Sequence, residues 1–217
     1  TEAMSNLVSI TCPINEPVIE KIQLNDNGMP EIIWNKVEGA LKYKIYRSDN
    51  QDGKYNEIGT IEETIYTDGD AKAGNVYFYK LVAIGNNTST ESNSESVICP
   101  VGTPNVEIAL NDNGAPVLNW SKSKGAVVYE VYRAESENGE YSKIAEVTET
   151  EYTDAKVAEN TAYFYKVRAV GTNANVTAES KVITVTSGTV PIVYDRAEGK
   201  NRYETAATSA DMLKQIY

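Results

Sequence analysis

The chain has 217 residues, 41% of them hydrophobic, with a net charge of −11 and no histidine. This apolar content is enough for folded cores and excludes a disordered acidic tail. The missing histidine removes the commonest general base and metal ligand, and the evenly spread acidic charge excludes a basic surface for nucleic acid or anionic membrane. No run approaches the roughly 18 apolar residues of a membrane span, so membrane insertion is not expected.

Residues 1–16 precede the first clear strand pattern. Their segment Ser9-Ile10-Thr11-Cys12-Pro13 resembles Ser96-Val97-Ile98-Cys99-Pro100 further along the chain. We therefore expect 1–16 to be the end of a preceding repeat or a linker, with Cys12 and Cys99 in equivalent positions one domain apart. A strand of about nine residues spans roughly 30 Å, well beyond the roughly 7 Å between the Cα atoms of a disulfide. These two cysteines are predicted not to be paired with each other.

The body of the chain repeats itself with a period of 86 residues. From Asn25 to Gly85, 26 of 61 positions are identical to those 86 residues later, without a gap. A period of this length fits a small domain and is too long for one unit of a solenoid. We expect a first domain at 17–102 and a second at 103–187.

Each copy contains seven short alternating runs separated by turn signals, which is typical of a β-sandwich or barrel. The strands expected in the first copy are 17–23, 30–35, 41–48, 54–60, 64–68, 75–85 and 93–99. Those expected in the second copy are 103–109, 116–121, 127–134, 140–146, 150–154, 161–171 and 179–186. The sequence Asn-Asp-Asn-Gly is predicted to turn the first strand of each copy into the second, because Asn and Gly tolerate positive φ. Alternation predicts an inward set of Ile32, Trp34, Tyr43, Ile45, Tyr77, Tyr79, Leu81 and Ala83, repeated as Leu118, Trp120, Tyr129, Val131, Tyr163, Tyr165, Val167 and Ala169.

Several motifs, each occurring twice in the same order, resemble bacterial fibronectin type III domains. They are the second-strand Trp, Gly-Ala-x-x-Tyr-x-(Ile/Val)-Tyr-Arg, Thr-x-Tyr-Thr-Asp, and Tyr-Phe-Tyr-Lys. The resemblance covers about 17–187 and implies seven strands in two antiparallel sheets in each copy. It also implies that Tyr77 and Tyr163 are corner tyrosines whose hydroxyls tie the preceding loop to the sheet. The expected fold class is all-β: two tandem seven-stranded fibronectin type III-like sandwiches plus a short C-terminal helix.

The tail, residues 188–217, breaks the strand pattern. A helix is predicted over 201–214, with Asn201 as its N-cap and Glu204 three residues later. The stretch from Arg196 to Ala206, which contains Arg-Tyr-Glu-Thr-Ala, resembles the opening of the second class of clostridial cell-wall-binding repeat. We interpret 188–217 as a linker and the truncated start of such a repeat; the alternative is an ordinary C-terminal helix packed on the second domain. The resemblance implies a secreted, wall-anchored parent protein.

Acidic residues in the first copy raise the possibility of a calcium site. They are Asp49, Asp52, Asp68 and Asp70, with Asn50. The spacing of an EF-hand loop is missing, and the second copy has Glu135, Asn138 and Lys156 in place of three of the four aspartates. Turn chemistry explains these residues better. Without histidine no nucleophilic triad is available, so no catalytic, cofactor-binding or metal-binding residue is predicted, and no cofactor.

Tyrosines predicted to face outward are the remaining candidates for a ligand site. They are Tyr46, Tyr55, Tyr132 and Tyr141, beside Arg47 and Arg133. Stacked aromatic rings bind sugars and peptides, yet the same residues recur in both copies and cross-strand aromatic pairs also stabilise sheets. We interpret them as scaffold and assign no ligand-binding residue.

The leading hypothesis is a non-catalytic extracellular spacer, or stalk, in a cell-wall-anchored surface protein of a Gram-positive, clostridial-type bacterium. Short joints that contain proline, at 100–104 and 187–191, predict a semi-rigid array. Its expected partners are neighbouring domains of the same protein and, through missing C-terminal repeats, cell-wall polymer; a monomer is expected. One alternative is an adhesion module that binds host protein or glycan. Another is an accessory region of a wall hydrolase whose catalytic domain lies outside this chain.

Overall fold

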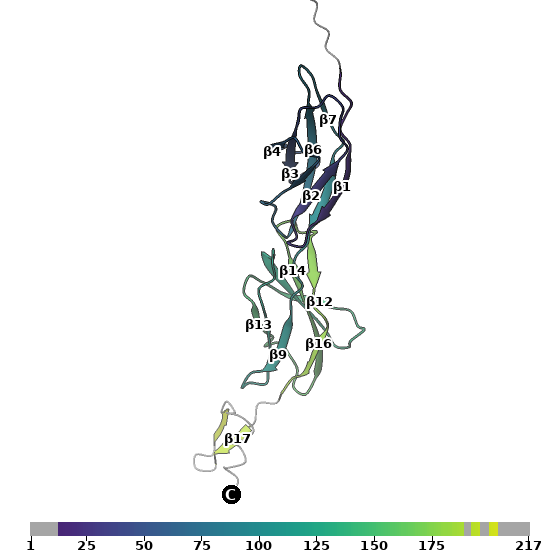
Figure 1. The fold of residues 1–217 in the computed structure, drawn as a ribbon. Coiled ribbons are helices and arrows are strands. Elements are labelled where there is room, and N and C mark those ends of the chain that lie inside the picture. Colours follow the sequence, from purple (N-terminus) through teal and green to yellow (C-terminus); the bar gives the residue numbers. More distant parts are fainter. Residues whose placement is uncertain (1–12, 189–191, 196–199, 204–217) are drawn as a thin grey trace, which may run out of the picture. The chain divides into compact units, whose positions relative to one another are not determined.

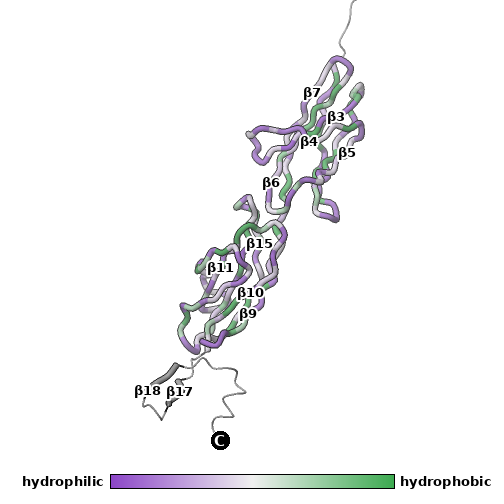
Figure 2. The backbone as a smooth tube through the Cα atoms, turned by 90° about the vertical axis from the view of Figure 1, so that its left-hand side faces the viewer, coloured by the Kyte–Doolittle hydropathy of each residue, from purple (hydrophilic) through white to green (hydrophobic). Residues whose placement is uncertain are grey.

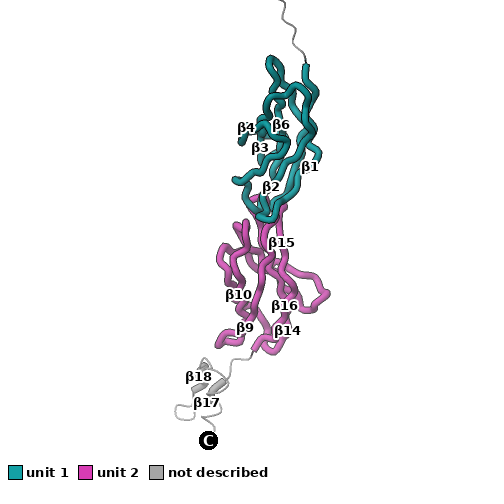
Figure 3. The backbone as a smooth tube through the Cα atoms, in the orientation of Figure 1, with its two compact units in different colours: residues 1–99 teal, residues 100–217 magenta. Residues whose placement is uncertain are grey.

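The structure is a computed structural model that describes residues 13–188, 192–195 and 200–203 (Figure 1). It divides into two compact units, one ending at Cys99 and the other beginning at Pro100 (Figure 3). Each unit is an all-β sandwich, and each is described here by itself. Among the described residues, no helix occurs that could cross a lipid bilayer.

Unit 1 consists of a three-stranded and a five-stranded antiparallel sheet. The smaller sheet has the order β1 (Ile19–Leu24), β2 (Pro30–Trp34), β5 (Ile65–Thr67). The larger sheet has the order β4 (Asn56–Ile61), β3 (Lys42–Ser48), β6 (Asn75–Ile84), and two short strands, β7 (Ser89–Glu91) and β8 (Glu95–Cys99), both pair with β6.

Unit 2 repeats this topology strand for strand. Its smaller sheet has the order β9 (Val106–Leu110), β10 (Pro116–Trp120), β13 (Glu151–Thr153). Its larger sheet has the order β12 (Ser142–Val147), β11 (Val128–Ala134), β14 (Ala162–Val170), and β15 (Thr177–Glu179) and β16 (Ile183–Thr186) both pair with β14.

The predicted Asn-Asp-Asn-Gly turns are confirmed. The Asn25 side-chain oxygen accepts the backbone N–H groups of Asn27 and Met29, each at 3.0 Å. Gly28 has a φ of 73°, a left-handed conformation that glycine adopts without strain. Asn111 and Gly114 repeat the arrangement in unit 2. The side chain of the first Asn and the freedom of Gly thus close the hairpin between the first two strands of each unit.

The predicted inward rows form the two cores. Strands alternate between buried and partly exposed positions, and Figure 2 shows hydrophobic colour along the strands and hydrophilic colour concentrated in the loops. In unit 1, Trp34 packs edge-on against Tyr43 with ring centroids 5.4 Å apart, and the Tyr43 hydroxyl accepts the N–H of Val37 at 2.8 Å. Aromatic pairs of this geometry add about 0.5–1.5 kcal/mol beyond the burial of their area. Tyrosine therefore fills the core while its hydroxyl satisfies a loop.

The prediction of seven strands per unit is wrong in one respect, because each unit has an additional short strand, β7 or β15, just before its last strand. In unit 2, β15 and β16 are separated at Ser180, whose hydroxyl accepts the N–H of Val167 at 3.0 Å while its own N–H donates to the Val167 carbonyl at 2.9 Å. Ser92 does the same for Leu81 between β7 and β8. A serine side chain replaces a backbone acceptor at the break, so the N–H of the central strand stays satisfied although the ladder is interrupted.

The helix predicted over 201–214 is also wrong where the structure describes it. Residues Lys200–Tyr203 form β18, which pairs in antiparallel register with β17 (Ile192–Asp195). Asn201 is therefore a strand residue opposite Tyr194 and not a helix N-cap. The run Ile192-Val193-Tyr194 has high strand propensity, and pairing with it outweighs the weak helical pattern that begins at Asn201. Residues 204–217, with the rest of that helix, lie outside the described residues.

Cys99 ends β8 and is buried, with 1% of its surface exposed. Cys12 lies outside the described residues. The prediction that the two do not pair therefore stays a prediction.

Replacing Ser180 by Ala should destabilise unit 2 by about 1–3 kcal/mol, because the buried N–H of Val167 loses its acceptor. Urea unfolding of the full chain, followed through NMR signals of unit 2, measures the effect. The matched control is Thr177→Ala, an exposed β15 position expected to change stability by less than about 0.5 kcal/mol. Equal stability of the two variants would contradict the role given to the serine hydroxyl.

Candidate functional site

A buried charged cluster links the two sheets of unit 1. Arg47 comes from β3, Tyr79 from β6, and Asp68 follows directly after β5 in the opposite sheet. The Arg47 Nη1 donates to both carboxylate oxygens of Asp68, at 2.7 and 3.0 Å. The Tyr79 hydroxyl donates to Asp68 Oδ2 at 2.8 Å. We call Arg47, Asp68 and Tyr79 the Arg–Asp–Tyr cluster.

Local structure holds the Asp68 carboxylate in this place. Its backbone N–H donates to the carbonyl of Pro30 on β2, and its Oδ1 accepts the backbone N–H of Asp70 at 3.1 Å. The side chain is 2% exposed, and the Arg47 guanidinium lies 4.9 Å above the ring of Tyr77. The carboxylate therefore has donors on both oxygens, as a buried charge requires.

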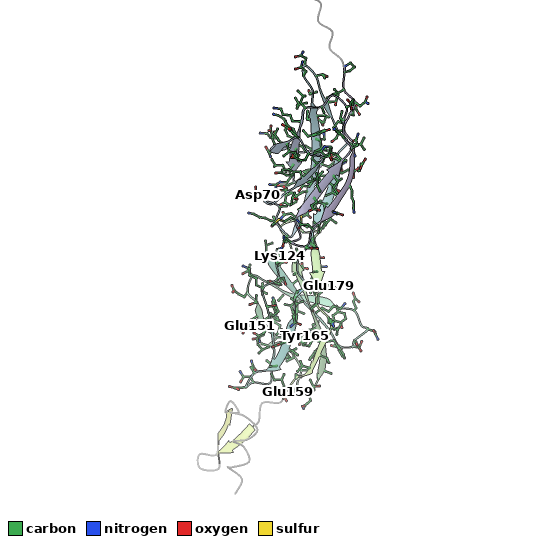
Figure 4. All side chains as sticks on the ribbon, viewed as in Figure 1. Asp70, Lys124, Glu151, Glu159, Tyr165 and Glu179 are labelled. Carbon is green, nitrogen blue, oxygen red and sulfur yellow. The ribbon has the colours of Figure 1, made fainter. Side chains whose placement is uncertain are left out.

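Unit 2 contains the same cluster at Arg133, Asp154 and Tyr165. Arg133 Nη1 donates to Asp154 Oδ2 at 2.7 Å, and the Tyr165 hydroxyl donates to the same oxygen at 3.0 Å. Figure 4 labels Tyr165, which is fully buried, together with Glu151 and Glu179, which are exposed. Both copies thus retain one arrangement of charge in their interiors.

The cluster strongly perturbs the acidity of its tyrosines. Burial, followed by the hydrogen bond to Asp68, raises the pKa of Tyr79 far above its usual value. Burial and the charge of Asp154 raise the pKa of Tyr165 in the same direction. These phenols stay protonated and act as donors, and the carboxylate they contact is sealed from solvent. The cluster holds the two sheets of its unit together, and it offers no accessible acid, base or nucleophile.

The corner tyrosines are confirmed next to this cluster. The Tyr77 hydroxyl accepts the N–H of Lys72 at 3.2 Å, and the Tyr163 hydroxyl accepts the N–H of Ala158 at 3.0 Å. Each therefore ties the loop before β6 or β14 to its own sheet.

Asp68 has a second role besides the one that the sequence suggested. We grouped it with Asp49, Asp52 and Asp70 as turn or calcium chemistry; its turn role is confirmed by the bond from the Asp70 backbone N–H, and the structure adds the buried pairing with Arg47 and Tyr79. The signal that could have found it is the repeat itself, since Arg47, Asp68 and Tyr79 are identical in the second copy while the other three acidic residues change. In the described part of the chain, no group of three or more Cys, Asp or Glu side chains is placed to hold a metal ion.

Among the four outward tyrosines, cations lie over the rings of Tyr55, Tyr132 and Tyr141. Lys80 lies 4.9 Å from the ring centroid of Tyr55, and Lys166 lies 4.5 Å from that of Tyr141. The Tyr55 hydroxyl is also bonded, to the Gln51 carbonyl and to Ser94 Oγ. Arg47 and Arg133 do not join this face, because both are engaged in the buried clusters.

Ion pairs cover the same outer faces. In unit 2, Glu130 accepts from Lys143 and Arg168, and the Tyr132 hydroxyl donates to it at 2.9 Å. The large hydrophobic side chains that are exposed among the described residues are aliphatic, with no aromatic among them. The contiguous aromatic patch expected of a sugar- or peptide-binding face is therefore not observed in this part of the chain.

Equivalent hollows lie beside the β3–β4 turn and the β11–β12 turn. The first has a volume of about 260 Å³ and is lined by residues that include Arg47, Asp49 and Lys54. The second, of about 320 Å³, is lined by residues that include Arg133, Glu135 and Glu140. The lining charge changes between the copies, since Lys54 corresponds to Glu140. A ligand site common to both units is therefore not indicated here.

Replacing Asp68 by Asn should destabilise unit 1 by about 2–3 kcal/mol, because it leaves the half-buried Arg47 guanidinium without its counter-ion. Asp70→Asn is the control: its side chain is exposed, its backbone contact to Asp68 is retained, and a change below about 0.5 kcal/mol is expected. Amide exchange resolved by residue reports on unit 1 and unit 2 separately. Equal effects of the two substitutions would refute a locking role for Asp68.

The chain should lose stability at alkaline pH. Unfolded tyrosines ionise near pH 10, whereas burial raises the pKa of Tyr79 and Tyr165 in the folded chain, so above about pH 10 the unfolded state binds fewer protons. The free energy of unfolding is then at its full value below pH 10 and falls as the pH rises further. Urea unfolding between pH 8 and 11.5, with tyrosinate absorbance recorded in parallel, tests this. Ordinary titration of all 15 tyrosines in the folded chain would contradict it.

The chain is similar in sequence to segments of curated proteins of two kinds, amylopullulanases and an exoglucanase. No protein-family model matches the chain. The chain is 38% identical over 90 residues to an amylopullulanase of Thermoanaerobacterium saccharolyticum, which is 41% of this chain and 7% of that protein. It is 27% identical over 162 residues to Exoglucanase B of Cellulomonas fimi, which is 67% of this chain and 14% of that protein. The chain thus spans only a small part of the curated relatives it matches.

A solved structure shares the architecture of both units. A segment of two fibronectin type III domains from chicken tenascin matches with a TM-score of 0.58 and 18% identity, over 81% of this chain and all of that segment. At this identity the match concerns the fold alone. The described chain consists of two fibronectin type III-like domains in tandem.

Proposed function

We propose that the chain is a non-catalytic accessory region of an extracellular glucan-degrading enzyme, in which its two domains serve as spacers. The observation that carries this proposal is the 38% identity to an amylopullulanase over a stretch that forms only 7% of that protein. A second named glucan hydrolase, Exoglucanase B, matches over a stretch that runs through most of this chain. This is the hydrolase alternative of the sequence analysis, with glucan in place of wall polymer as the substrate of the parent protein.

The chemistry of the two domains supports a role without catalysis. The Asp68 and Asp154 carboxylates are sealed inside their domains and fully engaged with Arg and Tyr donors. Glycoside hydrolysis needs two carboxyl groups that flank a substrate cleft, and these two lie in separate units. The rings of Tyr55 and Tyr141 lie under Lys side chains, so saccharide binding by the chain itself is not part of the proposal.

Extracellular placement is part of the proposal, because a polymeric glucan taken from the surroundings is too large to enter a cell and has to be cleaved outside it. The wall-anchored stalk predicted from Arg-Tyr-Glu-Thr-Ala rests on residues of which Glu204–Ala206 are outside the described part of the chain, and it stays a prediction. The adhesion alternative also stays a prediction. It is not favoured by the outer faces of the larger sheets, where charged side chains form ion pairs with each other.

The test uses the complete parent protein, with and without residues 13–188, alongside this chain alone. The chain alone should release no reducing sugar from starch, pullulan or cellulose, and its mobility should not be retarded in gels that contain those polymers. The complete protein should hydrolyse a soluble glucan, and the deletion variant should retain that activity, because the catalytic machinery lies elsewhere.

Two results would count against the proposal. Hydrolysis by the chain alone would contradict a non-catalytic role. A complete protein that lacks glucan hydrolysis but is retained on isolated cell walls would instead favour the wall-anchored stalk.

A further inference from the structure

The segment before β1 is docked on the end of unit 1. The Ile14 side chain packs against the core, and its Cγ2 lies so close to Gly39 and Gly85 that a Cβ on either glycine would be 3.2 or 3.3 Å from it. The Thr90 hydroxyl donates to the Asn15 carbonyl at 2.9 Å. Residues 14–15 therefore belong to the folded unit, although the sequence analysis placed the first domain from residue 17.

Unit 2 begins in the same way. Val101 lies two residues after Cys99, as Ile14 lies two residues after Cys12, and it is 6% exposed. The N–H of Gly102 donates to the Lys124 carbonyl at 2.9 Å, next to Gly125, which corresponds to Gly39. A Cβ on Gly102 would lie 3.0 Å from the Lys124 nitrogen, so the backbone approaches this loop closely.

The repeat is therefore 87 residues long at its start and 86 further on, and β1 explains the difference. Register between β1 and β2 shifts between Ile19 and Lys21, where Glu20 is an extra bulged residue. The equivalent pairing of β9 with β10 runs without a shift. Residues 12–19 thus align in sequence with 99–106, so Pro13-Ile14 and Pro100-Val101 are equivalent positions.

The connection between the two units begins at Cys99, the last residue of unit 1. Cys99 is the last residue of β8, is 1% exposed, pairs in register with Asn75, and its carbonyl accepts the N–H of Gly74 at 2.7 Å. Pro100 is exposed. Cys99 is thus fixed in one unit and Gly102 in the next, with Val101 at the sequence position that Ile14 has in unit 1.

We infer that Pro100 is the whole covalent joint between the two units, and that the apolar residue after it is a plug that fastens the joint to the following unit. The proline ring fixes its own φ near −65°, and the residue before a proline is restricted to extended conformations. The ψ torsion of Pro100 is then the principal soft torsion of the joint. Restricted reorientation follows from the chain itself, whatever the proposed function.

The test is ¹⁵N relaxation of the full chain, which gives a rotational correlation time for each unit. The two units of the wild type should tumble together. Inserting Gly-Ser-Gly-Ser between Cys99 and Pro100, which leaves the plug in place, should lower the correlation time of each unit by about twofold, toward that of a body of half the mass. The same insertion after Gly53, in an exposed turn, should leave tumbling unchanged.

A second variant tests the plug. In Val101→Ser, exchange of the Gly102 amide should rise at least about tenfold, while the Gly114 amide, bonded to the Asn111 carbonyl, keeps its protection and shows that unit 2 remains folded. Independent tumbling of the wild-type units would overturn the inference, as would coupled tumbling after the insertion at Cys99. Unchanged exchange at Gly102 in Val101→Ser would overturn the role of the plug.

Discussion

A carboxylate removed from water must be given a cation and hydrogen-bond donors, and in each domain this requirement fixes the arrangement of three strands. Asp68 leaves the smaller sheet, and its charge is met by Arg47 and Tyr79 of the larger sheet. Apolar burial is non-directional, whereas a charge with fixed donors favours one alignment of the two sheets. The corner tyrosine Tyr77 lies under the Arg47 guanidinium and accepts the N–H of Lys72. The loop before β6 is therefore connected through Tyr77 to the charged cluster.

The sequence predicts most of this fold because period-two alternation places side chains directly. Trp34, Tyr43 and Tyr79 were expected inward and are buried, and the Asn-Gly turns follow from residues that tolerate positive φ. The buried role of Asp68 was missed because an acidic residue after a strand has the composition of a turn, and only a contact 21 residues away reveals its partner. The break at Ser180 was missed because a small polar residue such as serine is compatible with either face of a strand, so the alternating pattern does not mark this position as an interruption. The tail was misassigned because Asn201 and Tyr203 fit a weak helix locally but pair with a stronger strand.

Comparison of the two domains separates scaffold from variable surface. The Arg–Asp–Tyr cluster, the corner tyrosine and the hairpin asparagine are identical in both, whereas the charges that line the β3–β4 hollow and its counterpart are not. Residues kept in both copies serve the fold, because each domain needs them independently. Among the described residues no outward site is shared by the two units, which is compatible with the spacer role proposed above.

The bulge at Glu20 has a consequence for how such arrays grow. In unit 1, strand β1 at the edge of the smaller sheet carries the additional residue Glu20. The other pairs between β1 and β2 match those between β9 and β10, so no core position changes. Edge strands can therefore gain or lose single amino acids after a gene segment is duplicated, while the interior tolerates no frame slip. Borders between duplicates can thus change in both length and sequence: Cys-Pro precedes each unit, whereas Ser187-Gly188 stands at the corresponding place after unit 2, so modules in a parent gene are better counted by their inner strands than by a fixed spacing.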